Sequence, residues 1–258
     1  MKLPSLLAGL MLCVTSGSAL SNTEETSQQQ ADPSAFTYVL VHGASGGGWD
    51  WKVIDQLLSD EGHIVYRATL TGLGERAHLA NPAINLTTHI DDVANLILFE
   101  GLDQVILVGH SYGGMVITGV MDRLPEHIKQ VFFLDAFVPG DGMAAVDLWG
   151  DLSEHKIKDG LVYFSWLDSS NPVPGDTPQS LKTLTEPVSF KDPKALALPV
   201  TYLPFVAGPA QVKVRSTMDQ SWKRAVSRGW TIRTLESDHN AQRSHPRELA
   251  DLLLEVIR

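Results

Sequence analysis

The stretch Val105-Ile106-Leu107-Val108-Gly109-His110-Ser111-Tyr112-Gly113-Gly114 decides how the rest of this sequence is interpreted. Its first half is apolar and rich in β-branched residues, as in a buried strand. Its second half contains Gly-x-Ser-x-Gly and leads into a helix-like segment from Met115 to Arg123. In this strand–turn–helix context the motif is typical of a nucleophile elbow, in which glycines leave room for a sharp, strained turn. The pattern therefore predicts that Ser111 presents a nucleophilic hydroxyl at the end of a strand.

Segments on both sides of this stretch alternate between strand-like and helix-like patterns. Strands are expected at residues 36–42, 64–70, 105–109, 131–135, 200–206 and 230–235. Helices are expected at residues 49–60, 88–99, 115–123, 212–227 and 246–257. Such alternation predicts an α/β fold with a mostly parallel central sheet flanked by helices. Ligands bind at the carboxyl ends of the strands in sheets of this kind, so we expect the site there.

Residues 140–198 interrupt this alternation within a domain that we expect to cover residues 35–258. The segment is rich in proline, and its large aromatic residues are Trp149, Tyr163, Phe164, Trp166 and Phe190. A plain connection of this length is uncommon in a compact domain. We therefore expect an inserted cap that covers the sheet and supplies an aromatic wall to the site.

Length and charge limit the classes of partner. The chain has 258 residues, which suits one α/β domain with a substantial core, and its formal net charge is −10. Because no basic patch offsets this charge, nucleic acid and anionic membrane surfaces are disfavoured as partners. A small-molecule substrate is the expected partner, and the sequence leaves the oligomeric state open.

The amino terminus has the pattern of a secretory signal rather than of a folded segment. Lys2 is followed by an apolar run from Leu3 to Val14 and then by small residues, which predicts cleavage after about Ala19. The polar residues 20–34 are expected to form a flexible leader. The sequence therefore predicts a protein that is secreted or periplasmic. Its only cysteine, Cys13, lies in the signal, so disulfides are not expected.

A serine hydroxyl needs a neighbouring base, and His239 is the best-placed candidate. It lies just after the last expected strand, downstream of the serine. His42 is expected to shape the loop after the first strand, and His110 to be a structural neighbour of the nucleophile. The remaining histidines are expected at the surface: His63, His78, His89, His127, His155 and His245.

The carboxylate that orients the base is less obvious. The loop at residues 204–211, where this acid commonly lies, contains no Asp or Glu. One strand earlier, Asp135 stands at the end of a buried strand, where a charge is costly unless it is paired. The next carboxylate after the loop is Asp219, which is expected well inside a helix. We favour Asp135 as the third member of the triad and keep Asp219 as the alternative.

Negative charge that develops on a tetrahedral intermediate requires fixed donors. The expected donors are the backbone N–H groups of Ala44, in the glycine-rich loop after the first strand, and of Tyr112, directly after the nucleophile. That loop has neither a Walker lysine nor a GxGxxG pattern, which excludes it as a phosphate-binding loop. No cofactor is expected, and no cluster of His or Asp has the spacing of a metal site.

The motifs His42 to Trp49 and Gly109 to Gly114 together resemble the methylesterase and hydroxynitrile-lyase branch of the α/β-hydrolase superfamily. Segments 69–76, 134–139 and 237–239 extend the resemblance, which is weakest in the cap. It implies an α/β-hydrolase fold, Ser111 as nucleophile, His239 as base, and the amides of Ala44 and Tyr112 as the oxyanion hole. The plant esterases carry an aspartate after the penultimate strand, and this chain does not. Haloalkane dehalogenases place their acid one strand earlier, where this chain has Asp135.

The resemblance predicts a bacterial secreted serine esterase that cleaves small carboxylic esters or lactones. Hydroxynitrile lyases pair a threonine in the first loop with a lysine after the histidine. Here those places hold Gly43 or Ala44 and Asn240, which favours hydrolysis. A non-catalytic small-ligand receptor on the same fold stays open as an alternative, as does a lyase or C–C hydrolase that uses the same triad.

Overall fold

The computed structural model describes residues 35–168, 170 and 173–255. The chain divides into a unit of Met1–Asp32, outside these residues, and a unit of Pro33–Arg258 that contains them. The signal peptide predicted at residues 1–19 and the leader predicted at residues 20–34 both lie outside the described residues. Among the residues that are described, no helix is both long and apolar enough to cross a membrane.

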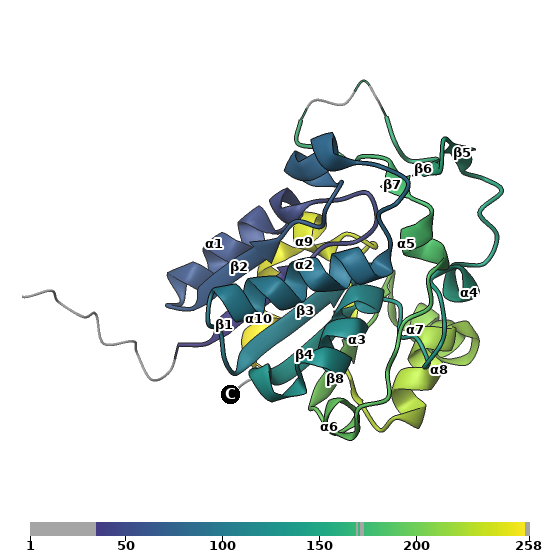
Figure 1. Cartoon of the computed structure of the whole chain (residues 1–258). Helices are drawn as coiled ribbons and strands as arrows, with labels where there is room; N and C mark the ends of the chain where they lie inside the picture. Colours follow the sequence, from purple (N-terminus) through teal and green to yellow (C-terminus); the bar gives the residue numbers. More distant parts are fainter. Residues whose placement is uncertain (1–34, 169, 171–172, 256–258) are drawn as a thin grey trace, which may run out of the picture. The chain divides into compact units, whose positions relative to one another are not determined.

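A six-stranded parallel sheet lies at the centre of the second unit (Figure 1). Its strand order is β10-β8-β4-β3-β1-β2, and every neighbouring pair is parallel. The strands are β1 (Thr37–Val41), β2 (Ile64–Ala68), β3 (Val105–His110), β4 (Ile128–Leu134), β8 (Val200–Leu203) and β10 (Thr231–Ile232). This sheet confirms the predicted α/β fold, and its order brings the ends of β3 and β4 side by side.

Helices cover both faces of the sheet, and successive residues of a strand supply the two cores. The covering helices are α1 (Lys52–Asp60), α2 (Leu86–Phe99), α3 (Gly113–Arg123), α9 (Ala241–Ser244) and α10 (Pro246–Glu255). Val39 and Val41 of β1 pack in one cluster with α2 and α3, whereas Tyr38 and Leu40 pack in another with α1 and α10. Because β1 is buried on both faces, its sequence is a continuous apolar run. Short 3-10 helices lie at η1 (Gly48–Trp51), η2 (Gly74–Leu79) and η3 (Pro125–His127).

The chain between β4 and β8 forms a separate layer of short elements, the cap. Its elements are α4 (Val146–Trp149), β5 (Lys156–Lys158), β6 (Leu161–Tyr163), β7 (Gln179–Ser180), α5 (Lys182–Thr185) and α6 (Pro193–Leu196). β5, β6 and β7 pair into a small antiparallel sheet. Two aromatic residues of this segment, Phe164 and Phe190, belong to the same buried cluster as α2 and α3, whereas Tyr163 and Trp166 are partly exposed.

The elements after residue 199 are shorter and more numerous than the sequence predicts. The single helix expected at 212–227 is wrong, because α7 (Pro209–Met218) and α8 (Gln220–Ser227) are separated by Asp219, whose backbone is extended. The strand expected at 200–206 divides at Pro204, which has no N–H to give to the ladder. The resulting β9 (Phe205–Val206) pairs with β11 (Leu235–Glu236), the detached end of the last expected strand.

Candidate active site

Ser111 occupies the turn between β3 and α3. Its φ angle is +52°, in the left-handed region that residues with a side chain rarely adopt. Its N–H donates to the Leu134 carbonyl at 3.2 Å, and its own carbonyl accepts from the Phe137 N–H at 3.0 Å. A Cβ atom on Gly113 would lie 2.8 Å from two main-chain oxygens at the end of β1. The strained serine is therefore fixed by the two strands beside it, and glycine is required for the chains to approach so closely.

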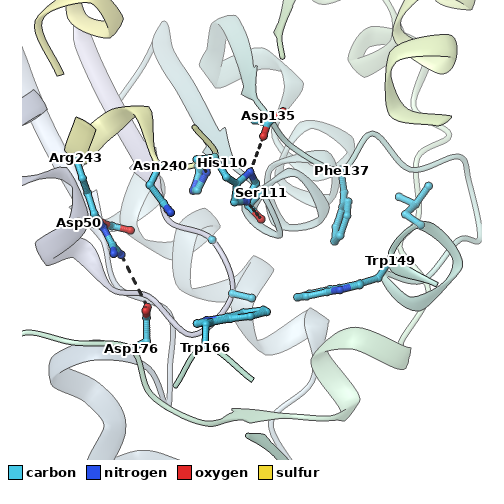
Figure 2. Close-up of a pocket in the computed structure, with 14 residues that line it drawn as sticks. Asp50, His110, Ser111, Asp135, Phe137, Trp149, Trp166, Asp176, Asn240 and Arg243 are labelled. Atoms are coloured by element: carbon cyan, nitrogen blue, oxygen red, sulfur yellow. Dashed lines mark hydrogen bonds and ion pairs between the residues drawn. The ribbon is translucent and has the colours of Figure 1, made fainter. Parts of the chain in front are cut away.

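Three side chains from three strand ends meet at this turn, and two of them, Ser111 and Asp135, are labelled in Figure 2. His239 Nε2 lies 3.0 Å from Ser111 Oγ, and His239 Nδ1 lies 2.5 Å from Asp135 Oδ2. In the neutral imidazole, Nδ1–H donates to the carboxylate and Nε2 is left as an acceptor. This tautomer is the one that can take a proton from the serine hydroxyl. The structure thus brings the predicted nucleophile, base and acid into one hydrogen-bonded chain.

Asp135 is held by more than the histidine. Its side chain is only 8% exposed, and Oδ1 accepts from Arg215 Nη1 at 2.6 Å and from the Phe205 N–H at 3.2 Å. Burial by itself would raise the pKa of this carboxyl group, but the hydrogen bond and charge of His239 and the Arg215 guanidinium outweigh burial. The pKa of Asp135 is therefore below its ordinary value. The carboxylate stays ionised and oriented at neutral pH.

Asp219, the alternative acid, makes no hydrogen bond to the histidine among the described residues. Its Oδ1 accepts from the N–H groups of Ser221 at 2.8 Å and Trp222 at 3.2 Å, which makes it the N-cap of α8. Its Oδ2 accepts from Arg215 Nη2 at 2.6 Å. Asp219 therefore reaches Asp135 only through the arginine between them, and the structure does not bring it to His239.

The two amides expected to face the oxyanion lie next to the nucleophile. Ala44 lines the same cavity as Ser111, and the loop that carries it is so close that a Cβ on Gly43 would lie 3.0 Å from the Ser111 Cβ. Tyr112 is the N-cap of α3, so its N–H belongs to the positive end of a helix. Within the described part of the chain, neither N–H donates to another protein group. Both donors are thus unused and adjacent to Ser111.

Two buried histidines hold the framework of the site. His42 Nδ1–H donates to the Gly43 carbonyl at 2.8 Å, and His42 Nε2 accepts from the Leu70 N–H at 3.1 Å. His110 Nε2–H donates to the main-chain carbonyl of His239 at 2.7 Å. Burial lowers the pKa of His42, and it lowers the pKa of His110 to about 4, so both rings are neutral. They fasten the loop after β1 and the segment of the base, as expected.

The surface position predicted for two other histidines is wrong. His89 and His155 were expected at the surface, but both are buried. His89 lies between the Tyr112 hydroxyl and the Thr71 carbonyl, each 3.0 Å from a ring nitrogen. His155 packs edge-on against the aromatic rings of the cap. The partners of His89 are distant in the sequence, whereas His155 is buried among aromatic residues of its own segment of the cap.

A cavity of about 730 Å³ opens in front of Ser111, and its two ends differ in character. Figure 2 shows Phe137 and Trp149 on one side of the serine, with Trp166 below it. The Trp149 and Trp166 planes are within 4° of each other, with ring centroids 5.9 Å apart. Phe164 stacks with both indoles. This end of the cavity offers flat aromatic faces to a ligand.

The other end of the cavity carries charged residues that the sequence analysis missed. Asp50 is buried and ion-paired with Arg243, whose guanidinium also lies 4.6 Å from the centre of the Trp49 ring. Asp176 of the cap lies 3.9 Å from the same arginine (Figure 2). Burial raises the pKa of Asp176 although Arg243 opposes the shift. Only their positions in the sequence could have indicated that these residues belong to the site. Asp50 follows the glycine-rich loop, and Arg243 follows His239.

The sequence was compared with models of known protein families. Residues 38–252 match the model of the alpha/beta hydrolase family, which is most of the chain. The chain belongs to the alpha/beta hydrolase family. The match includes Ser111, Asp135 and His239, together with the cap between β4 and β8. It confirms the predicted superfamily and fold.

Curated relatives of this alpha/beta hydrolase bear the names of esterases and of a ligand-binding protein. A protein of Nocardioides sp. (strain SG-4G), named carbendazim hydrolyzing esterase, is 53% identical over 111 residues, which are 42% of this chain and 46% of that protein. Salicylic acid-binding protein 2 of Nicotiana tabacum is 40% identical over 106 residues, or 40% of each chain. This chain therefore spans less than half the length of these curated relatives.

Solved structures support the same fold over almost their whole length. An extracellular alpha/beta-hydrolase from a Paenibacillus species has a TM-score of 0.68 at 23% identity, covering 85% of this chain and 98% of that one. A pyrethroid hydrolase from Sphingobium faniae JZ-2 has a TM-score of 0.65 at 18% identity, covering 86% and 96%. At these identities the likeness shows the fold and does not specify a substrate.

Proposed function

We propose that this alpha/beta hydrolase is an exported serine esterase that hydrolyses small carboxylic esters through an acyl-enzyme on Ser111. The observation that carries the proposal is the hydrogen-bonded chain from Ser111 Oγ through His239 to Asp135, with distances of 3.0 and 2.5 Å. The names of the Nocardioides esterase and of the extracellular Paenibacillus hydrolase support the reaction class and the export.

The reaction proceeds in two halves. Ser111 Oγ attacks the ester carbonyl as its proton moves to His239 Nε2, and the negative charge on the former carbonyl oxygen is met by the N–H groups of Ala44 and Tyr112. The C–O bond then breaks, and the imidazolium gives its proton to the leaving alcohol. A water molecule repeats these steps on the acyl-enzyme, which releases the carboxylic acid and restores Ser111. Asp135 stays ionised throughout and stabilises the imidazolium.

Covalent labelling separates this enzyme from a non-catalytic receptor on the same fold. A fluorophosphonate forms a phosphonyl–serine bond and releases fluoride only where a serine is activated by a base. We expect one adduct per chain, located on the peptide that contains Ser111 and absent from Ser111→Ala. The intact mass of the same sample shows whether the chain begins after about Ala19. A wild-type protein that binds esters but takes no label would establish the receptor instead.

The aromatic end of the cavity favours esters with a planar aromatic group. Trp149 and Trp166 present nearly parallel faces, and stacked aromatic pairs contribute about 0.5–1.5 kcal/mol beyond their buried area. The Nocardioides relative is named as an esterase that hydrolyses carbendazim. We propose that methyl esters of planar aromatic acids are preferred substrates of this protein.

Truncation at Trp149 tests this preference. We expect Trp149→Ala to lower kcat/KM for methyl 2-naphthoate about tenfold or more, because both stacking and apolar burial are lost. The same variant should change kcat/KM for methyl butyrate by less than about threefold, since that chain is too small to need the indole. Trp149→Phe keeps an aromatic face and serves as the matched control. Equal losses on both esters would show that the indole only supports the cap.

A further inference from the structure

Ser45, the residue after Ala44, is held by three hydrogen bonds from the cap, and its hydroxyl donates to the Ala44 carbonyl at 2.6 Å. It is fully buried, and its φ angle of +61° places a residue with a side chain in the left-handed region. Its N–H donates to Gln179 Oε1 at 2.9 Å, its carbonyl accepts from the Thr177 N–H at 2.8 Å, and its hydroxyl accepts from Trp166 Nε1–H at 3.0 Å. A strained conformation persists only where the surroundings over-determine it. The cap therefore fixes the loop that presents the Ala44 amide.

Gln179 is itself held by other groups of the cap. Its Nε2 donates to Thr183 Oγ1 at 2.7 Å, and the Thr183 hydroxyl donates in turn to the Ser180 carbonyl at 2.7 Å. Gln179 is 1% exposed, and Thr183 is fully buried. One run of buried polar groups thus extends from Ser45 through Gln179 and Thr183 to the main chain of the cap.

His89 holds the side chain of the second oxyanion residue, Tyr112. Burial lowers the pKa of His89 to about 4, so the ring is neutral and carries one N–H. Nε2 lies 3.0 Å from the Thr71 carbonyl, which can only accept, so the proton is on Nε2. Nδ1 is then the acceptor for the Tyr112 hydroxyl at 3.0 Å. The Tyr112 side chain is consequently held by His89 and, through it, by the loop after β2.

We propose that Gln179 and Thr183 are positioning residues that couple the cap to the oxyanion hole. The proposal rests on the proposed function, in which the amides of Ala44 and Tyr112 stabilise the tetrahedral intermediate. Donors act on a developing charge only if they are already in place, because reorganising them consumes the stabilisation. Buried networks whose members are all satisfied are rigid, and one missing member leaves the others unpaired. The cap thus positions the catalytic amides in addition to enclosing the substrate.

Thr183→Val tests this coupling with an almost isosteric side chain that lacks the hydroxyl. Loss of one oxyanion donor costs about 10²–10³ in kcat, so we expect a displaced donor to cost about tenfold to a hundredfold. KM for a p-nitrophenyl ester should stay within about twofold, because the cavity wall is unchanged. Thr183→Ser restores the hydroxyl and should restore most of kcat. Active-site titration with a fluorophosphonate normalises every rate to the folded, reactive fraction.

A tetrahedral mimic supplies the readout that a merely structural role would not change. Ser111 Oγ adds to the carbonyl carbon of an alkyl trifluoromethyl ketone, and its proton moves to His239. The resulting oxyanion lies at the Ala44 and Tyr112 amides. The Ki of the ketone should rise in Thr183→Val by the same factor by which kcat falls, whereas the Ki of the acid product should not change. Unchanged kcat and Ki in the titrated variant would overturn the proposal, as would equal changes in both inhibition constants.

A second variant keeps the proposal testable if Thr183→Val does not fold. Trp166→Phe removes the N–H that donates to Ser45 but leaves an aromatic ring in the stack, and Trp166 is 45% exposed. It should show the same parallel change in kcat and in the Ki of the trifluoromethyl ketone, and lack of that parallel would overturn the coupling. Failure of this coupling can be distinguished from failure of the proposed function. If Ser111 is not the nucleophile, the ketone inhibits wild type and Ser111→Ala equally.

Discussion

Ser111→Ala is expected to lower kcat/KM for a small p-nitrophenyl ester by about 10⁴–10⁶-fold, the range found when a serine nucleophile is removed from a triad. No other hydroxyl among the described residues is hydrogen-bonded to His239, so no side chain replaces the missing nucleophile. The residual rate would come from the Ala44 and Tyr112 amides and from substrate binding alone. The measurement is the release of p-nitrophenolate with purified wild type and variant at equal concentration.

The variant also separates chemistry from binding. The Ser111 side chain is small and lies in a rigid turn, so alanine should leave the melting temperature and the affinity for the acid product nearly unchanged. Ser227→Ala, on the exposed end of α8, is the matched control and should retain the wild-type rate. If Ser111→Ala hydrolyses the ester as fast as wild type, Ser111 is not the nucleophile and the acyl-enzyme proposal fails. Crystals of the variant soaked with esters would then show how substrates lie.

The central sheet could be predicted from sequence because its signals are local. β1 and β3 are buried on both faces, so they appear as apolar runs, and the amphipathic helices between them have a clear period. The break at Asp219 was missed because periodicity alone does not show where a helix is capped. The chemical signal was nevertheless present, since aspartate is among the preferred N-cap residues and its side chain accepts two N–H groups here.

The residues of the site that have local sequence signals could be predicted, and those that depend on contacts between distant segments could not. Ser111 and His239 stand in short segments whose pattern alone marks them, and Asp135 was found from its position at the end of a buried strand. The bond between Asp50 and Arg243 joins residues 193 apart, so no sequence pattern connects them. His89 likewise has its hydrogen-bond partner, the Tyr112 hydroxyl, on another element 23 residues away. Contacts of this kind require the fold.

Asp135→Asn is expected to lower kcat by about 10⁴-fold, as loss of the orienting carboxylate does in other triads. The asparagine amide can present an N–H to His239 Nδ1, which moves the ring proton to Nε2. That nitrogen can then no longer accept the Ser111 proton, although the heavy atoms keep their places. Because the Arg215 guanidinium and His239 hold the pKa of Asp135 below its ordinary value, the wild-type carboxylate is ionised at neutral pH, and the comparison is between charged and neutral side chains.

Asp219→Asn is the matched change at the alternative acid, and we expect it to retain kcat within about tenfold. Asparagine still caps α8, because its side-chain oxygen can accept the same two N–H groups. What is lost is the negative charge of residue 219, so that Asp135 becomes the ion-pair partner left to Arg215 among the described residues. Measurement of kcat and melting temperature for both variants distinguishes the two carboxylates. If Asp219→Asn is the crippling change and Asp135→Asn is mild, the base is oriented from α8, and the 2.5 Å contact between His239 and Asp135 is not the one used in catalysis.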